Sequence, residues 1–324
     1  MAGYRRREYP EFSWSHSRDC LFTSCRHAYY LRYYGSHNGW EHGAPPTAHR
    51  AWALGKLTGV PSALGAAVHQ RALECVAAVT AGAALRSAAD LIERSRGELN
   101  QLRTMRDRTG FLARPTAKPM LHETYYFGRV RPEVVERTRS KLVRCTLNLL
   151  ASPLWNDLRR CLDAGGEARV VDGRESFSFG ELTIYGAPDL AYRGGPADRP
   201  VIVDWKTGEL LGVVDQMAVQ GLLVRDHLGW APVDDRYTAR VIGLSEGQEH
   251  QLALDGRDLA DAETRIRASV ERMRKVLADP DRNIARPADE YPMKWGSWRC
   301  RSCPYLELCR ARVEEAANPG ADAA

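Results

Sequence analysis

Two carboxylates and a lysine in the middle of the chain have the types and spacing of a divalent-metal site. Asp189 lies in a largely apolar segment, residues 182–192, and Asp204 and Lys206 end a second one, residues 201–206. Both segments are predicted to be strands, and residues two apart on a strand share a face, so Asp204 and Lys206 would lie side by side with Asp189 on the neighbouring strand. Carboxylates are the hard oxygen ligands of Mg²⁺ and Mn²⁺, and a lysine adds a cation for a phosphate or a water. The three residues form a candidate phosphodiesterase centre, and a surface hairpin with solvated charges is the alternative.

The pattern around these residues resembles the signature of the PD-(D/E)XK nuclease superfamily, in its RecB-like branch. Its first part is Pro188-Asp189, and its second part is the run Ile202-Val203-Asp204-Trp205-Lys206-Thr207-Gly208. The resemblance implies that Asp189 and Asp204 bind the metal ion directly and that the backbone carbonyl of Trp205 contributes. It also implies that Lys206 orients the attacking water or neutralises charge that grows on the phosphate.

Two residues outside this signature are implied as site residues by the same resemblance. Gly65 and His69 match a Gly-x-x-x-His helix whose histidine joins the metal site in RecB-like nucleases, and a histidine half-buried on an amphipathic helix is the alternative. Gln216 matches the first position of the family's Gln-x-x-x-Tyr helix motif, whereas Gln220 stands where the family has tyrosine. Gln216 is therefore expected at the site, and the role of Gln220 stays open. Glu175 is a further candidate acidic neighbour.

Four cysteines form a second candidate site. Cys300, Cys303 and Cys309 supply three thiolates within one short segment, and a tetrahedral or cubane metal site needs a fourth. Resemblance to RecB-like nucleases of the AddB and CRISPR-adaptation type implies that Cys25 is the fourth ligand of a structural [4Fe-4S] cluster. Zn²⁺ bound by the same four cysteines is the chemical alternative, and a set of free thiols is the other.

The elements that position these residues are expected to form one α/β domain over residues 1–312. The resemblance implies a restriction-endonuclease-like core, with a small mixed central sheet flanked by helices. A helical insertion is expected at about residues 81–160, and an iron-sulfur cap is expected to join the segments 13–34 and 295–312. Residues 313–324 are expected to be a disordered tail, because they contain nothing to pack.

One part of the insertion, residues 101–131, interleaves arginines and lysines with aromatic residues. Such a mixture could bind single-stranded nucleic acid, with cations on phosphates and rings on bases. A solvated helical face with its aromatic rings in the core explains the pattern equally well. The aromatic residues concerned are Phe111, Tyr125, Tyr126 and Phe127.

Composition sets broad limits on the class of protein. The chain has 324 residues, of which 44% are hydrophobic and 27% charged, with a formal net charge of +5, as in ordinary soluble domains with a mild basic excess. No run reaches the roughly 18 to 20 apolar residues of a membrane span, and no apolar run follows the basic N-terminus, so a cytoplasmic location is expected. In that compartment the eight cysteines suit thiols or metal ligands better than disulfides.

These patterns predict a Mg²⁺- or Mn²⁺-dependent deoxyribonuclease, an exonuclease acting on single strands or DNA ends. The first alternative is a non-catalytic or weakly catalytic DNA-binding subunit of a helicase, recombination or defence complex, and the second is a zinc enzyme of another hydrolytic class. The sequence has no Gly-x-x-x-x-Gly-Lys-Ser/Thr motif, so DNA unwinding would need a helicase partner. DNA repair, CRISPR adaptation and phage defence all remain open as the pathway.

Overall fold

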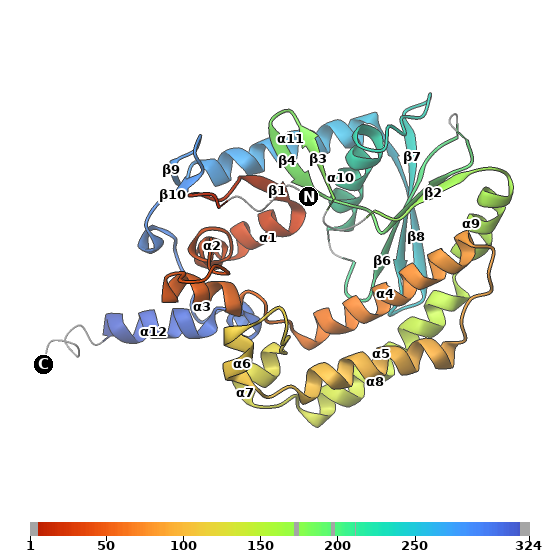
Figure 1. Cartoon of the computed structure of the whole chain (residues 1–324). Helices are drawn as coiled ribbons and strands as arrows, with labels where there is room; N and C mark the ends of the chain where they lie inside the picture. The colour runs from red at the N-terminus through yellow and green to blue at the C-terminus, as the bar shows by residue number, and fades with distance from the viewer. Residues whose placement is uncertain (1–5, 172–174, 196–197, 211, 318–324) are drawn as a thin grey trace, which may run out of the picture.

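The computed structural model describes residues 6–171, 175–195, 198–210 and 212–317. The chain forms a mixed α/β fold in which helices cover both faces of a central sheet (Figure 1). This architecture confirms the expected fold class and is consistent with a restriction-endonuclease-like core. No helix in the described ranges is both long and apolar enough to cross a membrane.

The central sheet has five strands in the order β2-β5-β6-β7-β8. Strand β6 is antiparallel to β5 and parallel to β7, and β8 is antiparallel to β7, so the sheet is mixed as predicted. The parallel pair β6 and β7 is joined by a helix, as such crossovers require. The bounds are β2 Glu167–Arg169, β5 Leu190–Arg193, β6 Val201–Lys206, β7 Arg236–Gly243 and β8 Gln248–Asp255.

A second sheet of three strands corrects one prediction. It consists of β1 (Ser13–Ser15), β4 (Leu182–Tyr185) and β3 (Ser176–Phe179), so the strand predicted over residues 182–192 is two strands in two sheets. The break occurs at residues 186–189. Gly186 packs so closely on α10 that a Cβ there would lie 2.7 Å from Val219 Cγ1, and Pro188 has no N–H to donate to a ladder. Asp189 therefore lies just before β5 instead of inside one long strand.

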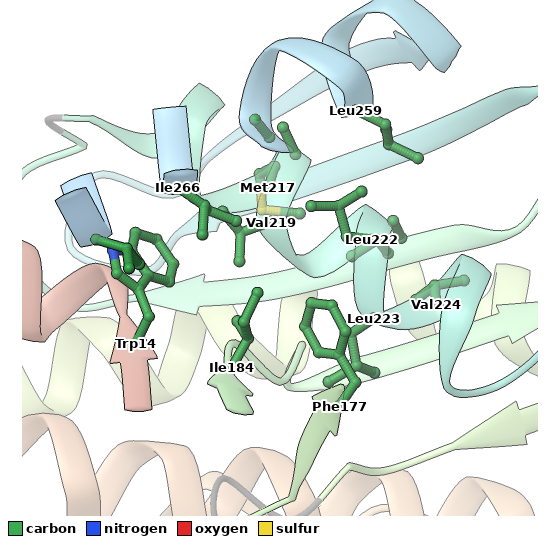
Figure 2. Close-up of a cluster of buried hydrophobic side chains, with 14 of the residues drawn as sticks. Trp14, Phe177, Ile184, Met217, Val219, Leu222, Leu223, Val224, Leu259 and Ile266 are labelled. Carbon is green, nitrogen blue, oxygen red and sulfur yellow. The ribbon is translucent and has the colours of Figure 1, made fainter. Parts of the chain in front are cut away.

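One face of the central sheet is covered by α10 (Val213–Asp226) and α11 (Gly256–Arg274). Helix α11 begins at a capping box, in which Asp255 accepts from the backbone of Asp258 and the Asp258 side chain accepts from Asp255 N. Apolar side chains of both helices meet the small sheet in one core, drawn in Figure 2, which includes Trp14, Phe177, Ile184, Met217, Leu222 and Ile266.

The other face is covered by α4 (Val60–Thr80) and α9, and α5 and α8 pack against α4 (Figure 1). These helices bury a second core against Val203 and Trp205 of β6. The expected insertion at residues 81–160 is helical, and its elements are α5 Ala88–Thr104, α6 Arg108–Ala113, α7 His122–Phe127, α8 Pro132–Ala151 and α9 Leu154–Asp163.

The aromatic residues of this insertion are mostly unavailable for stacking on bases. Phe111 and Tyr125 are buried in a third core, and the Tyr126 hydroxyl donates to Pro304 O at 2.6 Å. Of the four rings, only Phe127 is exposed. For Phe111 and Tyr125 the second interpretation is therefore correct: these rings lie in the hydrophobic core and are not available to stack on bases.

Segments from both ends of the chain pack together beside the sheets (Figure 1). Tyr34 donates to Asn283 Oδ1 at 3.0 Å, and Arg50 forms an ion pair with Glu307. Helix α12 continues to Ala317, into the segment expected to be disordered, and residues 318–324 lie outside the described ranges. The elements of this unit are α1 His16–Ser24, α2 Arg26–Tyr30, the π-helix η1 Leu31–Gly35, α3 Pro46–Leu54, β9 Leu277–Asp279, β10 Ile284–Ala285, the 3₁₀ helices η2 Ala288–Glu290 and η3 Trp298–Ser302, and α12 Leu306–Ala317.

Candidate active site and cysteine cavity

Strand β6 places Asp204 and Lys206 on the face of the sheet that α10 covers. Ile202, on the same face, is fully buried in the core under α10, while Val203 and Trp205 point to the α4 side. The period-two alternation of the strand thus separates the polar pair from its apolar neighbours. Asp204 Oδ2 and Lys206 Nζ lie 2.7 Å apart.

Helix α10 presents two glutamine amides to the same carboxylate. Gln216 Nε2 and Gln220 Nε2 each donate to Asp204 Oδ1 at 3.0 Å, and Gln216 Oε1 accepts from Lys206 Nζ at 2.8 Å. Residues four apart share a face of a helix, so a single helix supplies both donors. Gln220, whose role the sequence left open, is only 1% exposed and contacts Asp204 as directly as Gln216 does. Its spacing of four from Gln216, with a side chain that can donate like a tyrosine hydroxyl, was the signal that could have assigned it.

Asp189 reaches this site from the start of β5. Leu190 pairs with Val203, so the preceding residue lies beside Asp204, and Asp189 Oδ2 accepts from Trp205 N at 2.8 Å. Asp189 Oδ1 lies 3.0 Å from His69 Nε2, which α4 supplies. Helix α4 can lie this close because Gly65 has no side chain, since a Cβ there would be 3.3 Å from Thr207 Oγ1.

These side chains line one cavity at the end of β6, between α4 and α10, with a volume of about 330 Å³. His69, Asp189, Asp204, Trp205, Lys206 and Gln216, all candidates from the sequence, contribute to its wall. Glu175 does not, because it lies against His227, with 3.4 Å between Glu175 Oε2 and His227 Nε2.

The carboxylates and the imidazole of the cavity influence one another's protonation. Burial raises the pKa of Asp204, whose side chain is 3% exposed, and the nearby charge of Asp189 raises it further, while Lys206 and Gln220 act in the opposite direction. The hydrogen-bonding contact with Asp189 raises the pKa of His69 and outweighs burial, which would lower it. Protons therefore compete for the same atoms that could bind a metal ion.

Whether these residues could bind a metal ion depends on the spacing of their donor atoms, on the chemical type of those atoms and on the contacts that they already make. No group of three or more His, Cys, Asp or Glu side chains within the described ranges is spaced to hold a metal ion. Asp189 Oδ1 instead faces His69, and Asp204 Oδ2 faces Lys206. Asp204 Oδ2 is nevertheless buried and has no partner besides the ion pair with Lys206, so it keeps a lone pair that a cation could use. His69 Nε2 would offer a lone pair after losing the proton that it directs at Asp189 Oδ1. Carboxylate oxygens with one imidazole nitrogen fit Mg²⁺ or Mn²⁺ in donor type.

Comparison with known protein families matches residues 13–310 to the family model described as the PD-(D/E)XK nuclease superfamily. This range is most of the chain. The chain belongs to the PD-(D/E)XK nuclease superfamily. No curated protein matches the sequence significantly.

Membership of the superfamily indicates what kind of reaction this cavity could serve. Its members are typically nucleases that use divalent metals, and membership implies DNA as the substrate class. In this PD-(D/E)XK protein the signature residues Asp189, Asp204 and Lys206 come from adjacent strands and line one cavity. The matched range also spans the segments that carry all four candidate cysteine ligands, Cys25 to Cys309.

The four candidate cysteines of this superfamily member line a second cavity, of about 290 Å³. Cys25 lies between α1 and α2, Cys300 lies in η3, Cys303 ends η3, and Cys309 lies in α12. Burial, followed by the charge of neighbouring cysteines of the set, raises the pKa of Cys309 to about 12. All four are free thiols in this structure, and no three side chains among the described residues, these included, are spaced to hold one metal ion.

The remaining cysteines lie elsewhere. Cys75 and Cys145 are buried core thiols, and Cys161 is half-buried, as expected for residues that fill space. Cys20 is exposed, and its Sγ lies 3.5 Å from His16 Nε2. Cys20 does not line the cavity to which Cys25 contributes.

Proposed function

We propose that this protein is a Mg²⁺- or Mn²⁺-dependent deoxyribonuclease that hydrolyses phosphodiester bonds of single strands or DNA ends. One observation carries the proposal. Asp204 is held by Lys206, Gln216 and Gln220 beside Asp189 and His69 in one cavity, and these are the residue types that metal-assisted phosphodiester hydrolysis needs.

The metal ion, when bound, would polarise the scissile phosphate and lower the pKa of an attacking water. Asp189, Asp204 and His69 would hold it, with the backbone carbonyl of Trp205 as a further ligand. Because two amides occupy Asp204 Oδ1, the other oxygen, Oδ2, is the one left to bind a cation.

Lys206 and Gln216 would act on the substrate side of the site. In the present arrangement Lys206 Nζ is shared between Asp204 Oδ2 and Gln216 Oε1. With Asp204 Oδ2 as a metal ligand, Gln216 Oε1 would hold the Lys206 ammonium group and direct it into the cavity. There Lys206 orients a water or stabilises negative charge that develops on the phosphate.

The cysteine cavity supports a [4Fe-4S] cluster as a second, structural cofactor. Four thiols from both ends of the domain line one space of about 290 Å³. A cubane carries its thiolates on four separate iron atoms, whereas one tetrahedral Zn²⁺ holds all four on a single ion. The resemblance to RecB-like nucleases favours the cluster over zinc.

The experiment that tests the nuclease proposal compares the wild type with Asp204→Asn on end-labelled single-stranded and double-stranded DNA, with Mg²⁺ or Mn²⁺. Asp261→Asn is the matched control, because Asp261 is an exposed carboxylate on α11. We expect metal-dependent cleavage by the wild type and the control and a loss of about 10³-fold or more in Asp204→Asn. The label position distinguishes exonuclease from endonuclease cleavage.

Binding without cleavage by the wild type would instead support the alternative function, a DNA-binding subunit of a helicase, recombination or defence complex. Equal cleavage by Asp204→Asn and wild type would exclude the proposed site. Iron, sulfide and zinc analysis of anaerobically purified protein, with a visible spectrum, tests the cluster separately.

A further inference from the structure

The segment Lys294–Arg301, which we call the basic aromatic segment, has two exposed tryptophans. Trp298 is 74% exposed and Trp295 is 43% exposed. Tryptophan side chains are mostly covered in folded proteins, so two exposed rings three residues apart mark an interaction surface. The nuclease mechanism proposed above uses neither ring.

The charge of this segment is entirely positive. Lys294, Arg299 and Arg301 are exposed, and no acidic residue occurs between residues 291 and 306. Within the described ranges none of these three cations forms an ion pair with a carboxylate, in contrast to Arg50, Arg225 and Arg240. The Arg299 guanidinium lies over the Trp298 ring, 5.0 Å from its centroid. An exposed ring beside unpaired cations fits a ligand with flat apolar groups and regular negative charge.

Helix α1 connects this segment with the start of α10, the helix that carries Gln216. At one end of α1, Lys294 Nζ donates to Thr23 O at 3.0 Å. At the other end, His16 Nε2 approaches Gly212, where a Cβ would be 3.9 Å away, and Gly212 is the N-cap of the helix that carries Gln216. Helix α1 has nine residues, so the two ends are about 14 Å apart.

We propose that the basic aromatic segment is a stacking platform for single-stranded DNA that holds the strand while its end lies in the nuclease cavity. Bases stack on Trp298 and Trp295, and Arg299 and Arg301 contact phosphates. The proposal rests on the nuclease function proposed above. It adds that substrates long enough to span α1 bind better than substrates that fill only the cavity.

The position of the platform also links it to the four cysteines. Trp295, Trp298 and Arg299 line the same cavity as Cys25, Cys300, Cys303 and Cys309. A metal group bound by these cysteines would therefore hold in place the backbone that carries Trp295 and Trp298. This gives the cysteine segment a role in substrate binding besides its role in joining the ends of the chain.

The test measures binding of labelled oligothymidylates of increasing length to the full chain without divalent metal, so that no cleavage occurs. The variants are Trp298→Ala, Trp298→Phe and Trp40→Ala, the last being a matched exposed tryptophan, 44% exposed, in a different segment. We expect Trp298→Ala to weaken binding of long oligonucleotides by about 5- to 150-fold, the loss of one stacked base, and Trp298→Phe to retain most of it. Melting temperature and visible spectrum are recorded for each variant, so that an unfolded variant is recognised.

A second readout isolates the phosphate contacts. The double variant Arg299→Gln, Arg301→Gln should reduce the slope of log K against log salt concentration by about 1.4, since each single-strand phosphate contact contributes about 0.7. This change does not depend on an aromatic ring or on catalysis.

Each outcome decides between the platform and its alternatives. Unchanged binding in folded Trp298→Ala, or an equal loss in Trp40→Ala, overturns the platform even if the protein cleaves DNA. Binding of anionic vesicles but not of oligonucleotides would assign the segment to a membrane surface and also overturn it. Absence of cleavage with Trp298-dependent binding would contradict the nuclease function while supporting the platform.

Discussion

Asp204 is the residue on which the site depends most. It is 2% exposed, carries two amide donors on Oδ1 and faces Lys206 through Oδ2. A buried carboxylate is costly unless it is paired and hydrogen-bonded, and here nearly every contact serves that purpose. These contacts offset the cost of burying the negative charge of Asp204, so the carboxylate stays in a position where it could bind a metal cation.

We expect metal affinity to rise with pH between about pH 6 and pH 8. Metal binding requires a neutral imidazole, and the contact with Asp189 raises the pKa of His69 above its ordinary value of about 6.5. In the metal-free protein the raised pKa stabilises the fold fully below that ordinary value, and the stabilisation is lost as pH rises through the pKa of folded His69. Isothermal titration with Mn²⁺ in buffers of different ionisation enthalpy measures the released protons. Release of the same number by His69→Ala would contradict the prediction.

Gln220→Leu should weaken metal binding and slow cleavage by about 10- to 100-fold, the usual effect of removing a partner that orients a metal ligand. The leucine fills the buried space but leaves Asp204 Oδ1 with one donor instead of two. Mn²⁺ titration and single-turnover cleavage measure the effect, with Gln101→Leu, exposed on α5, as control. Wild-type affinity in Gln220→Leu would mean that Gln216 alone positions the carboxylate.

At the scale of elements, the distance between α4 and β6 sets the position of His69. Gly65→Leu should reduce cleavage strongly, because its side chain would push against Thr207 and move His69 from Asp189. Gly97→Leu is the matched control, since a Cβ at Gly97 on α5 meets nothing within 4 Å, and there the change should stabilise the helix by about 0.5–1 kcal/mol. Cleavage assays and thermal melting distinguish the two. A similar loss of activity in both variants would show that helix propensity, not spacing, is responsible.

The sequence predicted those elements whose pattern is local. Strand β6 is a short apolar run that ends in Asp204 and Lys206, two residues apart, so the shared face of these two residues could be predicted. The break between β4 and β5 has local signals in Gly186 and Pro188, but the sequence does not show the close packing of Gly186 against Val219 of a helix later in the chain.

The role of Gln220 was missed for a related reason. A motif comparison records that tyrosine is absent at this position, but only the packing of α10 on β6 shows that the glutamine amide reaches Asp204 Oδ1. The aromatic residues of the insertion are a similar case, since the exposed or buried state of Phe111 and Tyr125 depends on segments far from them in sequence.

At the scale of the whole molecule, the cysteine cavity joins segments from the two ends of the chain. Cys303→Ser should remove the visible absorption of a cluster and lower the melting temperature by about 10 °C or more, because metal-binding energy contributes directly to folding. Cys20→Ser, exposed and outside the cavity, should change neither. Spectroscopy and calorimetry of anaerobically purified protein measure both effects. An unaltered melting temperature in Cys303→Ser would remove the structural role.

The contacts that join the ends of the chain also affect how the protein folds during synthesis. Trp14 Nε1 donates to Ser269 Oγ, 255 residues later, and Asn283 Nδ2 donates to Pro10 O across 273 residues. At about 5–20 residues per second, the N-terminal segment waits about 13 to 50 s on the ribosome before these partners exist. During that time Phe22 and Tyr29 lack part of their core. Such long-range contacts raise the contact order and predict slow folding, because the N-terminal segment can complete its core only after Ser269 and Asn283 have been synthesised.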